Sequence, residues 1–206
     1  IMLKTLIVYL HRLATCIAIG TIVITDLRLM AKVMGYRVVI PKPERMETTI
    51  ITFALTLLYL TGAVIVYLGL QASPDYLHNE KLLAKLVLVG LLTVNAVVLH
   101  KAVFPILGRS RPVSQWSRRE WLTVSACVSL SNSTWLYCSF LGVARVWNGT
   151  VSMAHVLGVA MAVWLAAFLL VNAVLKLAAR DAPKPQPDWI DSMKASLSDF
   201  SDLRSH

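Results

Sequence analysis

The sequence has few of the residues from which catalytic and metal centres are usually built. It contains only three cysteines, Cys16, Cys127 and Cys138, and no two of them form a CxxC pair. All three lie in apolar stretches, where a free thiol packs as a small apolar side chain, so no disulfide framework is expected. The chain also lacks a Walker loop, a Rossmann glycine motif and a nucleophile–base pair. Nothing in the sequence therefore supports catalysis by this chain alone.

Charged residues are scarce as well, at 15% of the chain, and none of the acidic ones lies in the middle of an apolar stretch. Asp26 falls at a boundary, which argues against a proton or cation relay through this chain. The loops lack the methionine-rich or cysteine–histidine clusters that would collect copper. No pair of interrupted helices occurs in matching halves, so a secondary transporter is disfavoured.

What the chain does contain is five long apolar stretches, each bracketed by charge. They fall at about 5–27, 49–70, 82–107, 121–144 and 151–175. About 20 helical residues cross a hydrocarbon core of about 30 Å. Barrel strands would be about 10 residues long and would alternate in polarity, which these stretches do not. The sequence predicts an all-α integral membrane protein, a five-helix transmembrane domain over residues 1–180.

The positive charge is sorted between the two sides of this predicted bundle. The connections after the first and third stretches and the segment after the fifth carry most of the 20 Lys and Arg residues. The positive-inside rule then places the N-terminus outside and the C-terminus in the cytoplasm of a bacterial inner membrane. Sidedness also accounts for the net charge of +9, so no nucleic-acid partner is expected.

The C-terminal tail divides into two parts. Residues 181–187 are rich in proline and predict a stiff spacer. Residues 188–206 have apolar residues at helical spacing, namely Trp189, Met193, Leu197, Phe200 and Leu203. The polar face of this predicted amphipathic helix is not basic, which favours docking on its own basic loops or on other membrane subunits over anchoring to anionic lipid or disorder.

Two histidines share a predicted depth near the outer face. His11 lies one to two turns inside the first span and His155 about one turn inside the fifth, and these helices should run parallel. Arg12 and Arg145 flank that level. Two facing imidazoles with arginines above would suit a haem b, with the guanidinium groups paired to its propionates. Another metal, or two interfacial histidines bonded to backbone carbonyls, are the alternatives.

His100 lies near the inner end of the third stretch, at the level of Asp26 and Arg28. A structural cluster of these three residues is one interpretation. A second haem ligand or a quinone-site group is the other. The serine-rich stretch 121–144 is expected to pack centrally, with its hydroxyl groups bonding across helices.

Short motifs resemble a known group of proteins. His11, Gly20 and Asp26-Leu27-Arg28-Leu29 resemble the first-helix pattern of small, largely uncharacterised bacterial inner-membrane proteins. These are similar to the copper-resistance D-type membrane domain and, more distantly, to di-haem cytochromes b. Further matching residues are Lys85, Leu88, Asn95, His100, Trp135, Gly142 and Arg145, although Ala144 replaces a glycine of the pattern. The resemblance covers about residues 5–145 and implies a small helical bundle with His11 and His100 as the matching histidines.

Together these features lead to a haem b-binding electron-transfer protein, expected as a small subunit of a respiratory or photosynthetic membrane complex. Its predicted ligands are His11 and His155. The alternative is a cofactor-free accessory subunit that packs against a larger complex through its spans and its tail. Copper handling is a third hypothesis, by analogy with the copper-resistance family.

Overall fold

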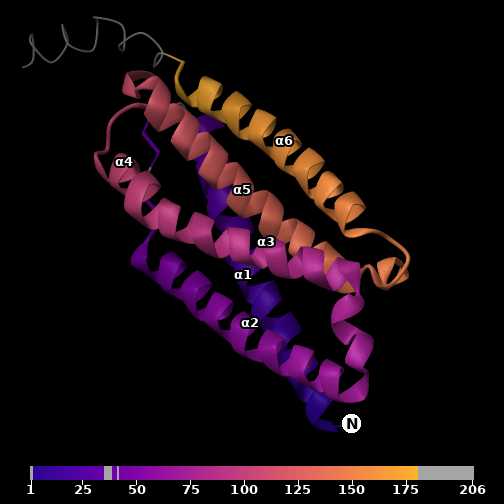
Figure 1. The fold of residues 1–206 in the computed structure, drawn as a ribbon. Helices are drawn as coiled ribbons and strands as arrows, with labels where there is room; N and C mark the ends of the chain where they lie inside the picture. The colour runs from indigo at the N-terminus through magenta and orange to yellow at the C-terminus, as the bar shows by residue number, and fades with distance from the viewer. Residues whose placement is uncertain (1, 35–38, 41, 181–206) are drawn as a thin grey trace, which may run out of the picture.

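The computed structural model describes residues 2–34, 39–40 and 42–180, and within them every regular element is a helix (Figure 1). The long helices are α1 (Met2–Met34), α2 (Arg45–Ala72), α3 (Glu80–Val98), α5 (Arg118–Val143) and α6 (Met153–Ala178). The short elements are η1 (Pro74–His78), the π-helical turn η2 (Leu99–Val103), α4 (Phe104–Gly108), η3 (Val113–Gln115) and η4 (Arg145–Trp147). The all-α expectation is thus confirmed for this part of the chain. The predicted spacer 181–187 and tail helix 188–206 lie outside the described residues.

Among the residues that the structure describes, four helices are long and apolar enough to cross a membrane. They are Met2–Arg28, Arg45–Ala72, Glu80–Gly108 and Met153–Ala178, the third running continuously through α3, η2 and α4. The sequence predicts a fifth crossing at 121–144, which lies in α5. That helix has comparable length but is less apolar, because it carries a series of serines.

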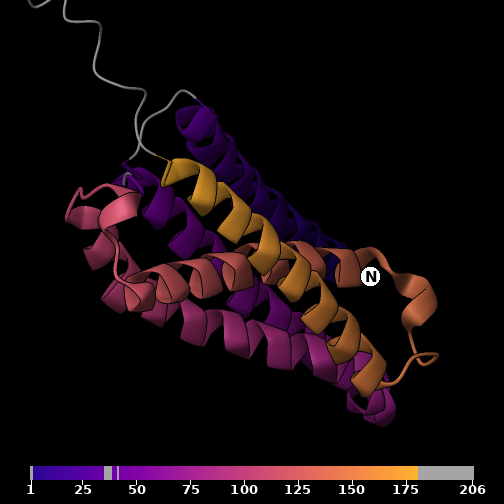
Figure 2. The ribbon, with the colours of Figure 1, turned by 90° about the horizontal axis from the view of Figure 1, so that it is seen from above.

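The helices form two groups. α1 packs along α2 as a hairpin, while α5 packs against both α3 and α6 (Figure 1). α6 also contacts both α1 and α3, and in the view from above it runs diagonally across the bundle (Figure 2). A buried cluster joins the two groups, with Ala18 and Ile22 of α1, Ala54 of α2, Leu92 of α3 and Trp135 of α5.

α5 is the central element, and its burial explains its composition. Ser125, Ser129 and Ser133 are 0–4% exposed and recur every four residues along one face. Small side chains let neighbouring helices approach closely. Each serine hydroxyl donates to a carbonyl of α5 itself, three residues back. The expected central packing is therefore confirmed, but these hydroxyls bond along their own helix, because that carbonyl is always within reach.

The outer faces of the bundle are apolar. Phe53, Val94 and Leu169 are each more than 60% exposed, and many other large apolar side chains are also on the surface. A water-soluble domain rarely leaves so much contiguous apolar surface uncovered. These faces suit a lipid environment and a multi-pass membrane protein.

The end of the bundle near residues 109–117 is named the inner end, because the predicted charge sidedness places it in the cytoplasm. The end near residues 73–79 is named the outer end.

Candidate functional site

His11 lies between α1 and α2, and its protonation pattern follows from the hydrogen bonds around it. Its Nδ1 lies 2.8 Å from Thr61 Oγ1, and the Thr61 hydroxyl donates to the carbonyl of Leu57 over 2.6 Å. Since the only hydroxyl proton is already donated, the imidazole must be the donor to Thr61. Its Nε2 therefore keeps a free lone pair. This is the tautomer in which a histidine binds a metal through Nε2 while a neighbour fixes the ring.

The imidazole lies against α2 beside Gly62, the residue after Thr61. A Cβ at Gly62 would lie 3.6 Å from His11 Cε1, ordinary contact distance. The ring is half-buried, and Thr61 is only 5% exposed. The polar pair is thus held at a fixed place in the interface between these two helices.

Lys85 of α3 lies close enough to His11, and also to Cys138 of α5, to interact with each electrostatically. Its Nζ would be 3.5 Å from a Cβ at Gly142, so the amine rests against α5. It makes no hydrogen bond to any described residue. A cationic side chain inside a membrane span is costly and marks a functional site by default.

One turn earlier, Lys81 has a structural role. Its Nζ donates to the carbonyl of Ala144 over 2.6 Å and to Asn148 Oδ1 over 2.9 Å, and the residue is 8% exposed. This ties the start of α3 to the turn between α5 and α6. Lys81 and Lys85 are four residues apart on one helix, yet only Lys85 keeps an unbonded amine.

His155, the predicted partner of His11, has a different environment. Its side chain is exposed, and its ring meets that of Trp147 edge to face at 5.7 Å. Its backbone N–H donates to Ser152 Oγ at the start of α6. No hydrogen bond or ring contact joins His155 to His11 within the described ranges. The shared depth along the helix axes thus does not bring the two rings into contact in this structure.

The two predicted propionate partners are also on the surface. Arg12 and Arg145 are both exposed, and neither forms an ion pair with another described residue. Arg145 lies in η4, next to the turn that Lys81 holds. In this structure the cationic group that acts electrostatically on His11 is Lys85 rather than either arginine.

The expected cluster at the inner boundary is replaced by three separate pairings. Asp26 accepts a hydrogen bond from Asn132 Nδ2 over 2.8 Å. Arg28 pairs with Glu47 at 3.0 Å. His100 instead donates from Nδ1 to the carbonyl of Ala96 over 2.8 Å, because a carbonyl can only accept. Asp26 and Arg28 each pair with a residue of a neighbouring helix, whereas His100 bonds within its own helix.

The backbone around His100 is unusual. The helix widens into a π turn over Leu99–Val103, and the N–H of Phe104 bonds to the carbonyl of Leu99, five residues back. Pro105 follows directly; it has no N–H, and its ring clashes with a regular helical turn. Such single π turns occur frequently at functional sites. His100 lies in this turn, with its ring edge to face on Phe104 at 4.8 Å.

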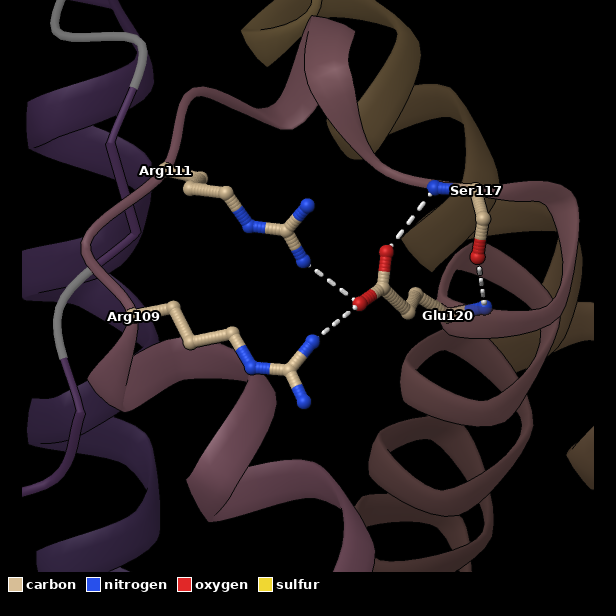
Figure 3. Close-up of polar contacts among 4 residues, drawn as sticks. All are labelled: Arg109, Arg111, Ser117 and Glu120. Atoms are coloured by element: carbon tan, nitrogen blue, oxygen red, sulfur yellow. Dashed lines mark hydrogen bonds and ion pairs between the residues drawn. The ribbon is translucent and has the colours of Figure 1, made fainter.

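At the inner end, Glu120 fixes the loop between α4 and α5 (Figure 3). Its Oε1 accepts from Arg109 Nη1 at 2.9 Å and from Arg111 Nη2 at 2.5 Å, while Oε2 accepts from the N–H of Ser117. Ser117 Oγ in turn accepts from the N–H of Glu120, which completes a capping box. The bond from the Ser117 N–H is the main cause that lowers the pKa of Glu120, and Arg111 adds to it.

Sequence analysis missed Lys85 and Thr61 as members of the His11 site. Lys81 and Lys85 at a spacing of four within an apolar stretch were a usable signal, since both must lie on one helix face. Thr61 gave no such signal, because threonines are common in this chain and only the packing of α1 on α2 selects this one.

Within the described residues, no three histidine, cysteine or acidic side chains gather where they could hold a metal ion. A haem needs fewer protein ligands, because its porphyrin supplies four of the iron ligands and the chain needs to supply only axial nitrogens. The free Nε2 of His11 fits one such position. No protein-family model, curated protein or solved structure matches this chain.

Proposed function

We propose that this chain is a small electron-transfer subunit of the inner membrane that binds a haem b at His11. One observation carries the proposal: the bond from His11 to Thr61 leaves the Nε2 lone pair of His11 free. The unbonded amine of Lys85 in the same space would pair with a propionate. When bound, the haem supplies the one-electron chemistry, and the chain supplies the axial nitrogen, the tautomer and the charge.

The proposal includes five membrane crossings, with the N-terminus outside and the C-terminus in the cytoplasm. α5 would be the fourth crossing, and its serines are compatible with lipid because they face neighbouring helices. His155 would be the second axial ligand only after its ring leaves Trp147, so it is tested separately from His11.

The test is a reduced-minus-oxidised absorption spectrum of the full chain purified in mild detergent. A haem b α-band is expected in the wild type and should be lost in His11→Ala. His78→Ala is the matched control, since that histidine lies in η1 at the outer end. Loss of the band in His155→Ala would assign a six-coordinate iron, and retention would assign His11 as the only axial ligand from this chain.

Thr61→Val tests the observation on which the proposal rests, the hydrogen bond between His11 and Thr61. Valine keeps the shape of threonine but cannot accept the Nδ1 proton, so haem affinity should fall by roughly 10- to 100-fold, as for other groups that orient a metal ligand. Thr21→Val is the control, because Thr21 makes the same kind of backbone bond on an exposed face of α1. A wild-type protein without an α-band would refute the proposal and leave the accessory-subunit alternative.

A further inference from the structure

A second candidate site lies toward the inner end, where α2 faces the π turn. It is an open groove of about 360 Å³, lined by Thr48, Thr49, Thr52, Phe53, Thr56 and His100. The groove lies between the first half of α2 and the π turn η2. It does not include His11, Lys85 or any other member of the haem site proposed above.

The threonines offer only hydrogen-bond acceptors. Thr49 donates its hydroxyl proton to the carbonyl of Arg45, Thr52 to that of Thr48, and Thr56 to that of Thr52, over 2.7–2.9 Å. Thr48 likewise donates to a carbonyl in the first turn of α2. Because each hydroxyl proton is already used, the oxygens keep only lone pairs.

His100 adds a stronger acceptor of the same kind. Its Nδ1–H is donated to the carbonyl of Ala96, so Nε2 keeps its lone pair. The residue is exposed and lines the groove. The ring is further held by its contact with Phe104. These side chains can therefore only accept further hydrogen bonds.

This pattern discriminates between ligands. Phosphates, carboxylates and quinone carbonyls offer hydrogen-bond acceptors. Their lone pairs would face the lone pairs of the groove side chains with no proton between them. A donor is required. An ammonium group is disfavoured because no acidic side chain lines the groove to pair with its charge. A neutral hydroxyl remains, and the exposed ring of Phe53 fits a flat apolar body.

We propose that this groove binds the reduced, dihydroxy form of a membrane quinone, with one phenolic hydroxyl donating to His100 Nε2. The site does not depend on haem binding at His11, and each can fail without the other. It prefers the hydroquinone over the quinone of the same ring, since only the hydroquinone has protons to donate.

The test is anaerobic equilibrium dialysis of the full chain in detergent against ubiquinol-1, with ubiquinone-1 as the oxidised pair. The hydroquinone should bind at least about 10-fold more tightly than the quinone, the effect of about one hydrogen bond. His100→Phe keeps an aromatic ring but removes the acceptor, and should abolish this preference. Equal binding of the two forms, or an unchanged preference in His100→Phe, would overturn the proposal.

Two further variants distinguish a specific loss of binding from misfolding of the protein. Thr52→Val is isosteric and should weaken hydroquinone binding by about 3-fold, whereas Thr150→Val, in the turn between α5 and α6 outside the groove lining, should leave it unchanged. Equal weakening by both would overturn the assignment. So would displacement of the hydroquinone by phosphatidylethanolamine with phosphatidylglycerol inert, because the groove would then hold a lipid ammonium group.

Discussion

The chemistry of a histidine in a membrane depends on which of its nitrogens carries the proton. In His11 and His100 that proton is on Nδ1, because Thr61 Oγ1 and the carbonyl of Ala96 can each only accept it. Both rings therefore present a free Nε2. The sequence located these histidines by depth, but it could not assign the tautomer, since the partner of His11 is 50 residues away.

Lys85 is the residue through which the haem proposal can be tested quantitatively. A unit charge about 10 Å from the iron contributes about 1.7 kcal/mol at an effective dielectric constant of about 20. Lys85→Met should therefore lower the midpoint potential by roughly 70 mV, measured by redox titration of the α-band. Lys4→Met, near the exposed start of α1, is the control and should shift it little. Equal midpoint potentials in all three proteins would show that the charge of Lys85 does not act on the haem iron.

Glu120 predicts a pH dependence of stability. Its pKa is lowered below the ordinary 4.5, first by the backbone N–H of Ser117 and then by Arg111. A carboxylate with a lowered folded-state pKa stabilises the fold above its unfolded-state pKa and loses that effect as the pH falls through the folded-state value. The melting temperature of the wild type should exceed that of Glu120→Gln at pH 7, and the gap should narrow as the pH falls below the ordinary pKa of 4.5.

A control separates this effect from general acid destabilisation. Asp75→Asn changes a carboxylate that is 88% exposed at the outer end, so its melting profile should follow that of the wild type across the same range. A gap between wild type and Glu120→Gln that stays constant with pH would show that the charge of Glu120 does not stabilise the loop.

At the scale of elements, α5 shows why hydropathy alone does not identify a buried helix. Its serines lower its apolar character below that of the other long helices, yet it is surrounded by α3 and α6. The serine pattern predicted central packing from sequence, because small residues at every fourth position form one helix face. The direction of the hydroxyl bonds could not be predicted, since both the helix and its neighbours offer acceptors.

The close approach at α5 leads to an overpacking prediction. Ser129 is 0% exposed, so Ser129→Leu should lower the free energy of unfolding by about 1–3 kcal/mol, the usual cost of added volume in a packed interior. Unfolding in a denaturing detergent measures it. Ala166→Leu, on the exposed face of α6, should be near neutral. A neutral Ser129→Leu would mean that α5 is not packed as closely as the structure shows.

At the scale of the whole molecule, the number of bilayer crossings decides which loops share a side. Five crossings place Pro74 and the N-terminus on one side and Ser110 and the C-terminus on the other. Single cysteines at Met2, Pro74, Ser110 and Arg180, in a chain whose own cysteines are replaced by serine or alanine, should react with an impermeant maleimide from the periplasmic side only at the first two. Labelling of Met2 and Arg180 from the same side would rule out the five-span topology.

The sequence alone determined that the described chain is helical and apolar enough for a membrane, because apolar length is a local property of the chain. The π turn before Pro105 was not predicted from sequence and appeared only in the structure. Tertiary structure decided that His11 pairs with Thr61, that His155 lies against Trp147, and that His100 lines a groove of acceptors. These outcomes depend on how helices pack side by side, and in a bilayer that packing is selected by side-chain fit rather than by hydrophobicity, which lipid satisfies equally well.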